Sequence, residues 1–395
     1  MCSYNKVQLA SEQSHGLFSC ENSLSLQRDL KERMNFSGFV LSDYGGTHSM
    51  SINAGLDQEM PGFAFLNASG INASLASGAL SMGKLDDSAK RILAALFAVG
   101  LFDKPNLNTP ANNMATPEHH AIAGELAAAG TVLLKNAGPL LPLKLSNGAE
   151  TSNGTDPEGL APYTIAVIGH EAIGVTVAGG GSGHVVPAKL TGPLAAIRSR
   201  VGITGNSSCN AAGSVCVRFQ DVTQTSDIGG AVALAKASSV SLVFVATSSQ
   251  EGIDRSNLSL SAACQSTAPN CASPLTVDQD AMINAVVAVA GAKTAVVAVC
   301  PGALLTPWAT QAAAVLVPSP LNLLEEFGAR ASQSDSGLPH DCFRRLMLLV
   351  ALLVQVPFMP GQAYGDAIAS ILFGDTNPSA RLPVTFPMSE RECDH

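Results

Sequence analysis

One carboxylate, Asp43, follows an apolar run at 38–41 that is typical of a short buried strand. Ser42 and Asp43 are predicted to end that strand, and the glycines at 45 and 46 then free the backbone to turn. Barrels and open α/β sheets collect their catalytic groups at the carboxyl ends of parallel strands. The alternative is an Asx cap for the following turn, and position alone favours the cap.

A second carboxylate, Glu251, comes just after a predicted buried strand at 241–246, and Asp254 and Arg255 follow it closely. The alternative explanation is a solvated loop with an Asp–Arg pair. If Asp43 and Glu251 faced one cleft, they would suit glycoside hydrolysis, one as nucleophile and the other as proton donor. Spacing along the chain does not establish that they face each other.

Other chemistries find little support in the sequence. The glycine-rich stretch 178–187 suggests a phosphate cradle, but it matches neither G-x-G-x-x-G nor G-x-x-x-x-G-K-S/T. A nucleotide-binding role is therefore disfavoured. The eight histidines are scattered, and none stands at metal-site spacing or in a Ser-His-Asp order.

Composition limits the partners of the protein. The formal net charge is −9 and there is no run of Lys or Arg, which argues against nucleic acid and anionic membrane surfaces. The longest apolar run, 346–356, is too short to span a bilayer as a helix. A chain of 395 residues that is 46% hydrophobic can form two or three domains with sizeable cores.

Cysteines and glycosylation motifs favour a secreted protein. Locally spaced cysteines without a CxxC motif fit disulfides in an oxidising compartment better than metal binding. These sets are Cys2 and Cys20, Cys209 and Cys216, and Cys264 and Cys271. N-x-Ser/Thr sequons begin at Asn35, Asn67, Asn72, Asn153, Asn206 and Asn257. The first residues lack the features of a signal peptide, so secretion would require a different N-terminus.

The elements that must position the carboxylates form two α/β regions. Residues 1–105 alternate strand-like and helix-like segments, including a predicted amphipathic helix at 24–34, but supply only about two strands. From residue 163 onward the alternation predicts an open, mostly parallel sheet with helices on both faces. A stretch rich in Pro and Asn, 103–118, reads as a linker. The segment 318–356 interrupts the second region and is long for a connection inside a compact α/β unit.

A series of sequence blocks runs in a recognisable order from residue 1 to about 387. The blocks are MCSYN, CENS, LKERMNFSGFVLSDYGGTHS, AGLDQEMPG, VLLKN, LLPL, IAVIG, GGGSGHVVP, TSSQEGIDRSNLSL, PGALLTPW and PFMPGQAYGDAIASILFGDTNPSARLPVTFP. Together they resemble glycoside hydrolase family three, the β-glucosidase family. The resemblance implies a (β/α)8 barrel followed by an α/β sandwich, with the sugar bound between them.

The resemblance also implies roles for single residues. Asp43 falls on the Asp of the family's S-D-W motif, which is the nucleophile, and Tyr44 replaces the Trp that packs on the sugar. Glu251 lies in the E-G-x-D-R region, which contains the acid/base in related enzymes. The residues matched to the glucose subsite are Met1, Tyr4 and Ser182.

A retaining mechanism without cofactor or metal follows from these implied roles. The expected substrate is a β-glucoside or an oligosaccharide. The block AGLDQEMPG looks more like the β-glucosidases than the β-xylosidase branch, whose equivalent usually carries Cys. β-Xylosidase or another exo-β-glycosidase of the family stays the alternative substrate specificity. The sequence does not indicate an oligomeric state.

Departures from the family pattern suggest a fragment. The earlier barrel strands are missing, and with them the residues that grip the sugar hydroxyls, so we expect poor hydrolysis of aryl β-glucosides. A catalytically inactive fragment or pseudoenzyme, at most a weak sugar binder, is the alternative. The expected domains are 1–105, a C-terminal remnant of the barrel; 106–162, a linker and connecting helix; 163–387, the sandwich with the insertion 318–356; and 388–395, a tail outside the family pattern.

Overall fold

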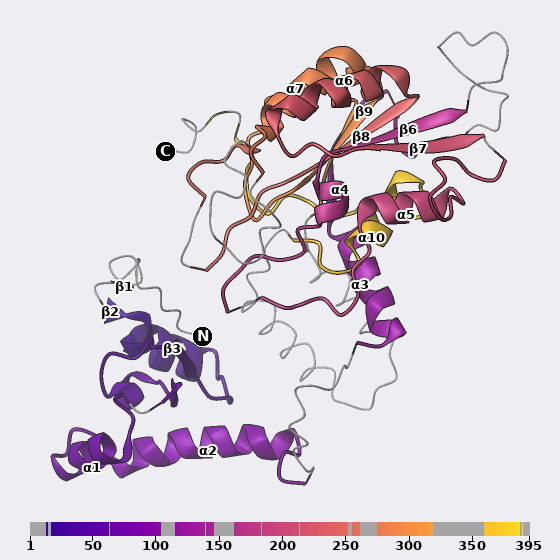
Figure 1. Ribbon diagram of the computed structural model, residues 1–395. Helices are drawn as coiled ribbons and strands as arrows, with labels where there is room; N and C mark the ends of the chain where they lie inside the picture. Colours follow the sequence, from indigo (N-terminus) through magenta and orange to yellow (C-terminus); the bar gives the residue numbers. More distant parts are fainter. Residues whose placement is uncertain are drawn as a thin grey trace. The chain divides into compact units, whose positions relative to one another are not determined.

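A computed structural model places the chain in two compact units, Met1–Asn112 and Asn113–His395 (Figure 1). Each unit is described by itself. The described residues are 13–14, 17–62, 64–103, 115–138, 140–145, 162–182, 184–212, 214–251, 255–260, 275–318, 359–387 and 389. Met1, Tyr4, Asp254, residues 319–356 and almost all of the tail 388–395 therefore lie outside the described residues.

The second unit contains a six-stranded sheet in the order β5-β10-β9-β8-β6-β7. Its strands are β5 (Thr131–Asn136), β6 (Tyr163–Ile168), β7 (Val215–Gln220), β8 (Val240–Ala246), β9 (Thr294–Val299) and β10 (Ala314–Pro318). All neighbouring pairs are parallel except β5 with β10, which is antiparallel. The sheet thus includes β5, from the region that the sequence assigned to the linker and connecting helix.

Helices cover both faces of this sheet, which confirms the predicted open, mostly parallel sheet (Figure 1). The helices α3 (Pro117–Ala129), α4 (Glu171–Gly174), α5 (Pro193–Arg200) and α10 (Tyr364–Leu372) share one hydrophobic core with the sheet, and α6 (Ile228–Ala237) and α7 (Gln279–Ala290) share the other. Successive residues of a strand point to opposite faces. Ile165 and Val167 of β6 accordingly join the first core, and Ala166 and Ile168 join the second.

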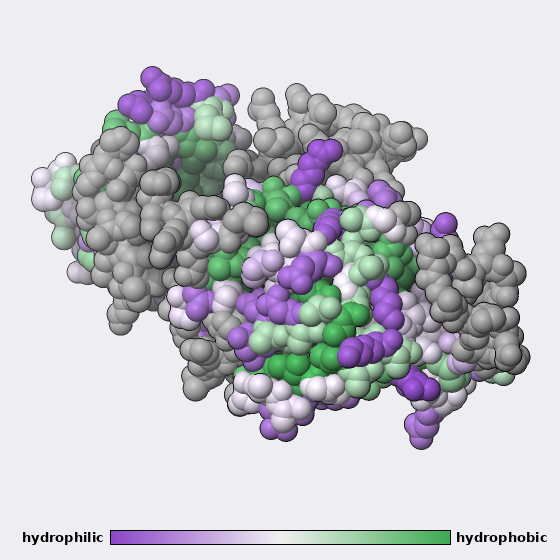
Figure 2. All heavy atoms as spheres, turned by 90° about the horizontal axis from the view of Figure 1, so that it is seen from above, coloured by the Kyte–Doolittle hydropathy of each residue, from purple (hydrophilic) through white to green (hydrophobic). Residues whose placement is uncertain are grey.

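Polar side chains cap two helices of this unit, α3 and α7. Thr116 caps α3 by accepting a hydrogen bond from the backbone of His119, and Asp278 caps α7 by accepting one from Ala281. Such caps satisfy backbone N–H groups that have no partner within the helix. Hydrophilic and hydrophobic side chains are interspersed on the side covered by α6 and α7 (Figure 2).

The strand order fixes where a ligand site can form. The chain starts the parallel part of the sheet at β6, places β7 on one side, and then crosses to place β8 on the other. A crevice opens at such a reversal, outside the carboxyl ends of the two central strands. The loops that follow β6 and β8 are therefore the ones to search for chemistry.

The first unit contains a short parallel pair of strands, β3 and β4, with a small core. Its elements are β1 (Gln13–Ser14), β2 (Leu17–Phe18), η1 (Ser19–Glu21), η2 (Leu24–Arg33), β3 (Leu41–Tyr44), η3 (Ser51–Ala54), β4 (Gln58–Met60), α1 (Ala68–Ala76) and α2 (Met82–Ala98). The predicted helix at 24–34 is present as η2, but it is a π-helix: Met34 N donates to Asp29 O over 2.9 Å, a step of five residues.

The strand that contains Asp43 lies further along the chain than predicted. The sequence placed the strand at 38–41 and ended it at Asp43, whereas β3 runs from Leu41 to Tyr44. Pairing with β4 sets these bounds, since Leu41 lies opposite Gln58 and Tyr44 lies opposite Met60. The prediction that Asp43 ends the strand is wrong by one residue, and Asp43 is the last-but-one residue of β3.

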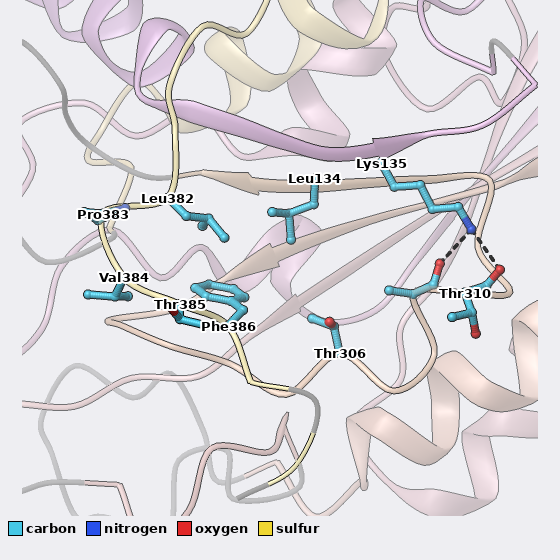
Figure 3. Close-up of a pocket in the computed structure, with 10 residues that line it drawn as sticks. Leu134, Lys135, Thr306, Thr310, Leu382, Pro383, Val384, Thr385 and Phe386 are labelled. Atoms are coloured by element: carbon cyan, nitrogen blue, oxygen red, sulfur yellow. Dashed lines mark hydrogen bonds between the residues drawn. The ribbon is translucent and has the colours of Figure 1, made fainter. Parts of the chain in front are cut away.

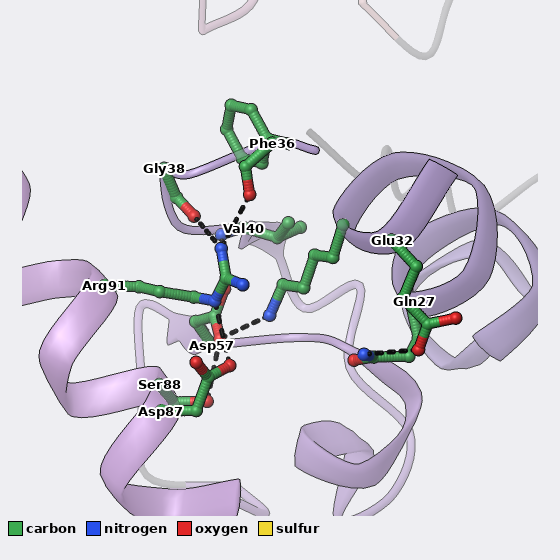
Figure 4. Close-up of polar contacts among 10 residues, drawn as sticks. Gln27, Glu32, Phe36, Gly38, Val40, Asp57, Asp87, Ser88 and Arg91 are labelled. Atoms are coloured by element: carbon green, nitrogen blue, oxygen red, sulfur yellow. Dashed lines mark hydrogen bonds and ion pairs between the residues drawn. The ribbon is translucent and has the colours of Figure 1, made fainter. Parts of the chain in front are cut away.

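A buried ionic cluster holds the first unit together (Figure 4). Asp57 Oδ1 accepts hydrogen bonds from Lys31 Nζ at 2.6 Å and from Ser88 Oγ at 2.7 Å, and Asp57 Oδ2 accepts one from Val40 N at 2.7 Å. The Lys31 and Asp57 side chains are 3% and 0% exposed. Burial lowers the pKa of Lys31, while the neighbouring Asp57 carboxylate acts in the opposite direction. One carboxylate thus connects η2, α2 and the residue that precedes β3.

Replacement of Asp57 by alanine is expected to destabilise the first unit by about 3–5 kcal/mol, because it leaves the Lys31 ammonium buried without its counter-charge. Hydrogen exchange of peptides from 38–60 would measure the loss, with peptides from the second unit unchanged. Asp29→Ala is the matched control, because Asp29 pairs with Arg28 and Arg33 at the surface, where solvent screens such pairs and they contribute little. Equal effects of the two substitutions would contradict the prediction.

Two further predictions can be compared with the structure, one on disulfides and one on membrane spans. A disulfide joins Cys209 and Cys216, as their spacing predicted. The other predicted sets include Cys2, Cys264 and Cys271, which lie outside the described residues. Within the described ranges, no helix is long and apolar enough to cross a membrane.

Candidate active site

Asp43 lies near the carboxyl end of β3, half-buried, just before the glycines at 45 and 46. Its Oδ1 accepts a hydrogen bond from Tyr44 N over 2.7 Å, and its backbone oxygen accepts one from Gly46 N over 3.1 Å. The backbone contact closes a turn, but the side-chain contact reaches only the next residue, whereas an Asx cap accepts from the backbone two residues on. None of the described hydrogen bonds uses Oδ2, so the same geometry leaves one carboxylate oxygen for chemistry. Tyr44, the predicted aromatic partner of a sugar, is 64% exposed.

The strand that contains Asp43 is anchored by two hydrogen bonds at residues just before Asp43. Ser42 is fully buried, and its Oγ accepts a hydrogen bond from Met60 N of β4 over 2.8 Å. Asp57, as described above, accepts a hydrogen bond from Val40 N. Because strand side chains alternate, the inward Ser42 places Asp43 on the opposite side. Sequence reasoning missed both anchors. The only signal was a carboxylate, Asp57, next to an apolar position in AGLDQEMPG.

Glu251 lies on the loop that follows β8, on the switch-point side of the sheet. Its Oε2 accepts a hydrogen bond from Ser182 N, in the glycine-rich loop, over 2.7 Å. The preceding residue, Gln250, forms an isolated parallel bridge with Gly180. The structure therefore brings together Glu251 and Ser182, two predicted site residues that are far apart in the chain.

The glycine-rich loop reaches Glu251 by close backbone approach. A Cβ atom on Gly179 would lie 2.7 Å from Ser249 O, and one on Gly181 would lie 2.4 Å from the Cβ of Glu251. Gly181 also has φ +84°, in the left-handed region that favours glycine. The glycines therefore serve to let this loop pack against residues 249–251. A phosphate cradle, which the sequence disfavoured, is not needed to explain them.

The electrostatics of Glu251 favour its ionised form. The N–H of Ser182 stabilises the carboxylate and thereby lowers its pKa, and the side chain is exposed to solvent. Because the pKa of Glu251 is lowered, the hydrogen bond from Ser182 N stabilises the contact between the two residues at pH values above the usual Glu pKa. This stabilisation is lost as the pH falls. A general acid needs the opposite, a proton held near neutral pH. The hydrogen bond from Ser182 N therefore favours the form of Glu251 that acts as a base.

A second carboxylate at the same edge, Glu171, was missed by sequence reasoning. It follows β6, and its Oε1 and Oε2 accept hydrogen bonds from Thr176 N at 2.7 Å and Thr176 Oγ1 at 2.9 Å. Burial raises the pKa of Glu171 to about 7, although both hydrogen bonds favour the carboxylate. Beside it, His170 Nδ1 lies 3.0 Å from Asp221 Oδ1. Glu171 thus braces the start of the segment that leads to the glycine-rich loop.

Several predicted site residues are not joined by the structure. Asp43 and Tyr44 lie in the first unit, whereas Glu251 and Ser182 lie in the second. Met1 and Tyr4 are outside the described residues, as noted above. Within the described part of the chain, no group of His, Cys, Asp and Glu side chains could hold a metal ion.

One groove of about 750 Å³ lies elsewhere, at the antiparallel edge of the sheet (Figure 3). It is lined by Leu134 and Lys135 of β5, by Thr306, Ala309 and Thr310, and by residues 382–386. Lys135 Nζ is occupied by the backbone oxygens of Ala309 and Thr310 at 2.9 and 2.8 Å. Since no carboxylate lines the groove, it does not suit glycoside hydrolysis.

The family of the chain follows from comparison with known proteins. A model described as "Glycosyl hydrolase family 3 C-terminal domain" matches residues 131–319 and 350–395, more than half of the chain. The matched residues lie within the second unit, Asn113–His395. The chain belongs to glycosyl hydrolase family 3.

Similar sequences include fungal and bacterial proteins. "Probable beta-glucosidase L" of Aspergillus terreus is 29% identical over 434 residues, which cover 99% of this chain and 47% of that protein. "Beta-glucosidase" of Rhizobium radiobacter is 36% identical over 225 residues, covering 56% of this chain and 24% of that protein. The chain spans about half the length of the fungal relative.

Solved structures share the fold. The beta-D-glucoside glucohydrolase of Trichoderma reesei superposes with a TM-score of 0.68 at 23% identity, covering 95% of this chain and 46% of that one. A beta-glucosidase of Chaetomella raphigera gives a TM-score of 0.67 at 24% identity, with the same coverage. At this level of identity the likeness shows a common fold, which extends over nearly the whole chain.

Proposed function

We propose that this chain contributes to the hydrolysis of terminal non-reducing β-D-glucosyl residues, with Asp43 as nucleophile and Glu251 as acid/base. The observation that carries the proposal is the position of each carboxylate within its own unit. One lies at the carboxyl end of a parallel strand, and the other lies on the loop after β8 at the switch point of the sandwich. The names of the relatives support a β-glucoside as substrate.

In the proposed mechanism, Asp43 attacks the anomeric carbon and forms a glycosyl-enzyme ester, while the bond to the leaving oxygen breaks. Glu251 gives its proton to that oxygen. The resulting carboxylate then takes a proton from water, whose oxygen attacks the same carbon. The ester bond to Asp43 breaks, the Asp43 carboxylate is regenerated, and glucose leaves with its original configuration. The hydrogen bond from Ser182 N supports this second step, because it favours the ionised form of Glu251. Two carboxylates suffice for both steps.

The proposal extends to the architecture and location of the protein. Residues 1–105 form the end of a barrel domain whose other strands would complete the sugar site, with Tyr44 against the sugar ring and Met1, Tyr4 and Ser182 at the glucose subsite. The segment 318–356 is proposed as an insertion in the sandwich, in line with residues 320–349, which the family model leaves unmatched. We infer a secreted glycoprotein, supported by the Cys209–Cys216 disulfide and the sequons.

A second candidate is a non-catalytic sugar binder. The ionised state of Glu251 favours it, because an acid that has already lost its proton cannot assist the leaving group. The exposed face of Tyr44 would still offer a surface on which a sugar ring can stack.

Turnover of p-nitrophenyl β-glucoside and β-xyloside by the purified chain separates these candidates. We expect slow hydrolysis, faster for the glucoside, with β-glucose as the first product seen by proton NMR. α-Glucose as first product would contradict the retaining mechanism, and a faster β-xyloside would contradict the proposed specificity. Absence of turnover together with measurable glucose binding would support the sugar binder.

A further inference from the structure

The loop between α5 and β7 presents one asparagine, Asn206, to solvent. Arg198 of α5 holds the loop from within, because its Nη2 donates to Gly205 O at 2.8 Å and to Ser207 O at 2.5 Å. These two carbonyl groups flank Asn206. Asn206 is exposed, and none of the described hydrogen bonds uses its side chain. The sequon Asn206-Ser207-Ser208 therefore lies in an ordered turn with its amide outward.

A disulfide joins this loop to β7, since Cys209 lies in the loop and Cys216 lies in the strand. Ser207 Oγ donates to Cys209 O at 2.7 Å and accepts from Cys209 N at 3.2 Å, so the sequon and the disulfide form one compact turn. Disulfides form and persist in oxidising compartments such as the endoplasmic reticulum. N-linked oligosaccharides are added to sequons of secreted proteins. The disulfide is thus an independent sign that this loop meets the conditions for glycosylation.

Two other sequons keep their amides in contact with their own chain. Asn67 caps α1, since its Oδ1 accepts from Gly70 N at 2.9 Å while its Nδ2 donates to Ala64 O at 3.3 Å. Asn257 Oδ1 accepts from the N and Oγ of Ser259 at 3.0 and 2.9 Å, so the hydroxyl of its own sequon is occupied. A sugar on Nδ2 would have to fit against those contacts.

The remaining sequons do not combine exposure with a disulfide in the same loop. Asn72, within α1, and Asn35, which has φ +50°, are exposed, but neither lies in a loop with a described disulfide. Asn153 lies outside the described residues. Of the sequons that the structure describes, the one at Asn206 combines exposure, an ordered turn and an adjacent disulfide.

We propose that Asn206 carries an N-linked oligosaccharide. Its Nδ2 would bond to the anomeric carbon of an oligosaccharide supplied on a polyprenyl diphosphate. The bond from that carbon to the diphosphate oxygen breaks, the diphosphate leaves, and Nδ2 gives up one proton. The inference rests on the secretion proposed above and is independent of catalytic activity.

The position of the sugar gives it a protective role. β7 is an edge strand of the sheet, and the loop already lies along it, with Asn210 N donating to Val215 O at 2.9 Å and Val217 N donating to Ser208 O at 2.8 Å. An uncovered edge strand is a template for pairing with another chain. A bulky, hydrated group on Asn206 would stand beside this edge and hinder such pairing.

The test is to express the chain behind a host signal sequence in a eukaryotic secretory host and to map its peptides by mass spectrometry. Enzymatic removal of N-glycans in heavy-oxygen water converts each occupied Asn to labelled Asp. We expect the Asn206 peptide to be labelled in most molecules. Ser208→Ala should abolish that label, and the matched variant Ser208→Thr should retain it. Label at Asn206 that persists in Ser208→Ala would contradict sequon-directed addition.

Protein retained in the cell is mapped together with secreted protein, because the sugar is added before export and a misfolded variant is then still informative. Unlabelled Asn206 in molecules with an oxidised Cys209–Cys216 pair would overturn the proposal. Unlabelled Asn206 with both cysteines reduced would overturn it as well, together with the inferred secretory route. Neither result depends on hydrolysis of any glucoside.

Discussion

The Asp43→Asn variant is expected to escape covalent labelling by 2,4-dinitrophenyl 2-deoxy-2-fluoro-β-glucoside. It is also expected to lose hydrolysis of aryl β-glucosides by roughly 10⁴-fold or more, the scale of losing a nucleophile. The reagent forms a glycosyl ester that hydrolyses slowly, and an amide cannot form that ester. Asparagine still offers an Oδ1 to the N–H of Tyr44, which now donates to Asp43 over 2.7 Å. The backbone of β3 should therefore stay in place.

Intact-mass measurement followed by peptide mapping reads out the label. Asp29→Asn is the control, since Asp29 is a surface carboxylate of the same unit that pairs with Arg28 and Arg33. Label on a residue other than Asp43, or undiminished label in Asp43→Asn, would show that the nucleophile is elsewhere. A parent chain that takes up no label at all would favour the sugar binder.

The Glu251→Ala variant is expected to separate substrates by their leaving groups. Hydrolysis of glucosides with poor leaving groups, such as methyl β-glucoside, should fall by about 10²- to 10⁴-fold, the usual contribution of general acid–base catalysis. Formation of the glycosyl ester from 2,4-dinitrophenyl β-glucoside should change little, because that phenolate leaves without a proton. The burst of dinitrophenolate and the steady-state rate measure these two steps.

Added azide distinguishes the role of Glu251 from that of Asp43. With Glu251→Ala, azide should attack the glycosyl ester and give β-glucosyl azide. With Asp43→Ala, it should attack the substrate directly and give the α-anomer. Glu118→Ala, at an exposed position in the first turn of α3, should behave like the parent chain. Equal losses of Glu251→Ala with both substrates, without rescue by azide, would remove Glu251 from the acid/base role.

Much of the sandwich could be predicted because its strands are buried on both faces. β6 and β8 appear in the sequence as continuous apolar runs, and in the structure nearly every residue of both strands is buried. The turn and linker residues between them separate the elements clearly. Local pattern therefore sufficed to locate β6 and β8 along the chain, and to place Glu251 just beyond β8.

Contacts between distant segments could not be predicted in the same way. Neither the hydrogen bond from Ser182 N to Glu251 nor the ion pair of Lys31 with Asp57 leaves a periodic signal. The bounds of β3 shifted for a related reason, since its pairing with β4 decides where it starts and ends. The glycine run at 179–181 did carry a signal, close backbone approach, but the sequence did not indicate which partner approaches.

The antiparallel strand β5 has a consequence for how the protein is made. It leaves the ribosome before every other strand of its sheet, yet its described neighbour there is β10, which emerges last. Until then an apolar strand has no partner, while the parallel core from β6 to β9 can already assemble. Such distant pairing slows folding and exposes the nascent chain to aggregation. Completion of this sheet therefore depends on an element that arrives only near the end of synthesis.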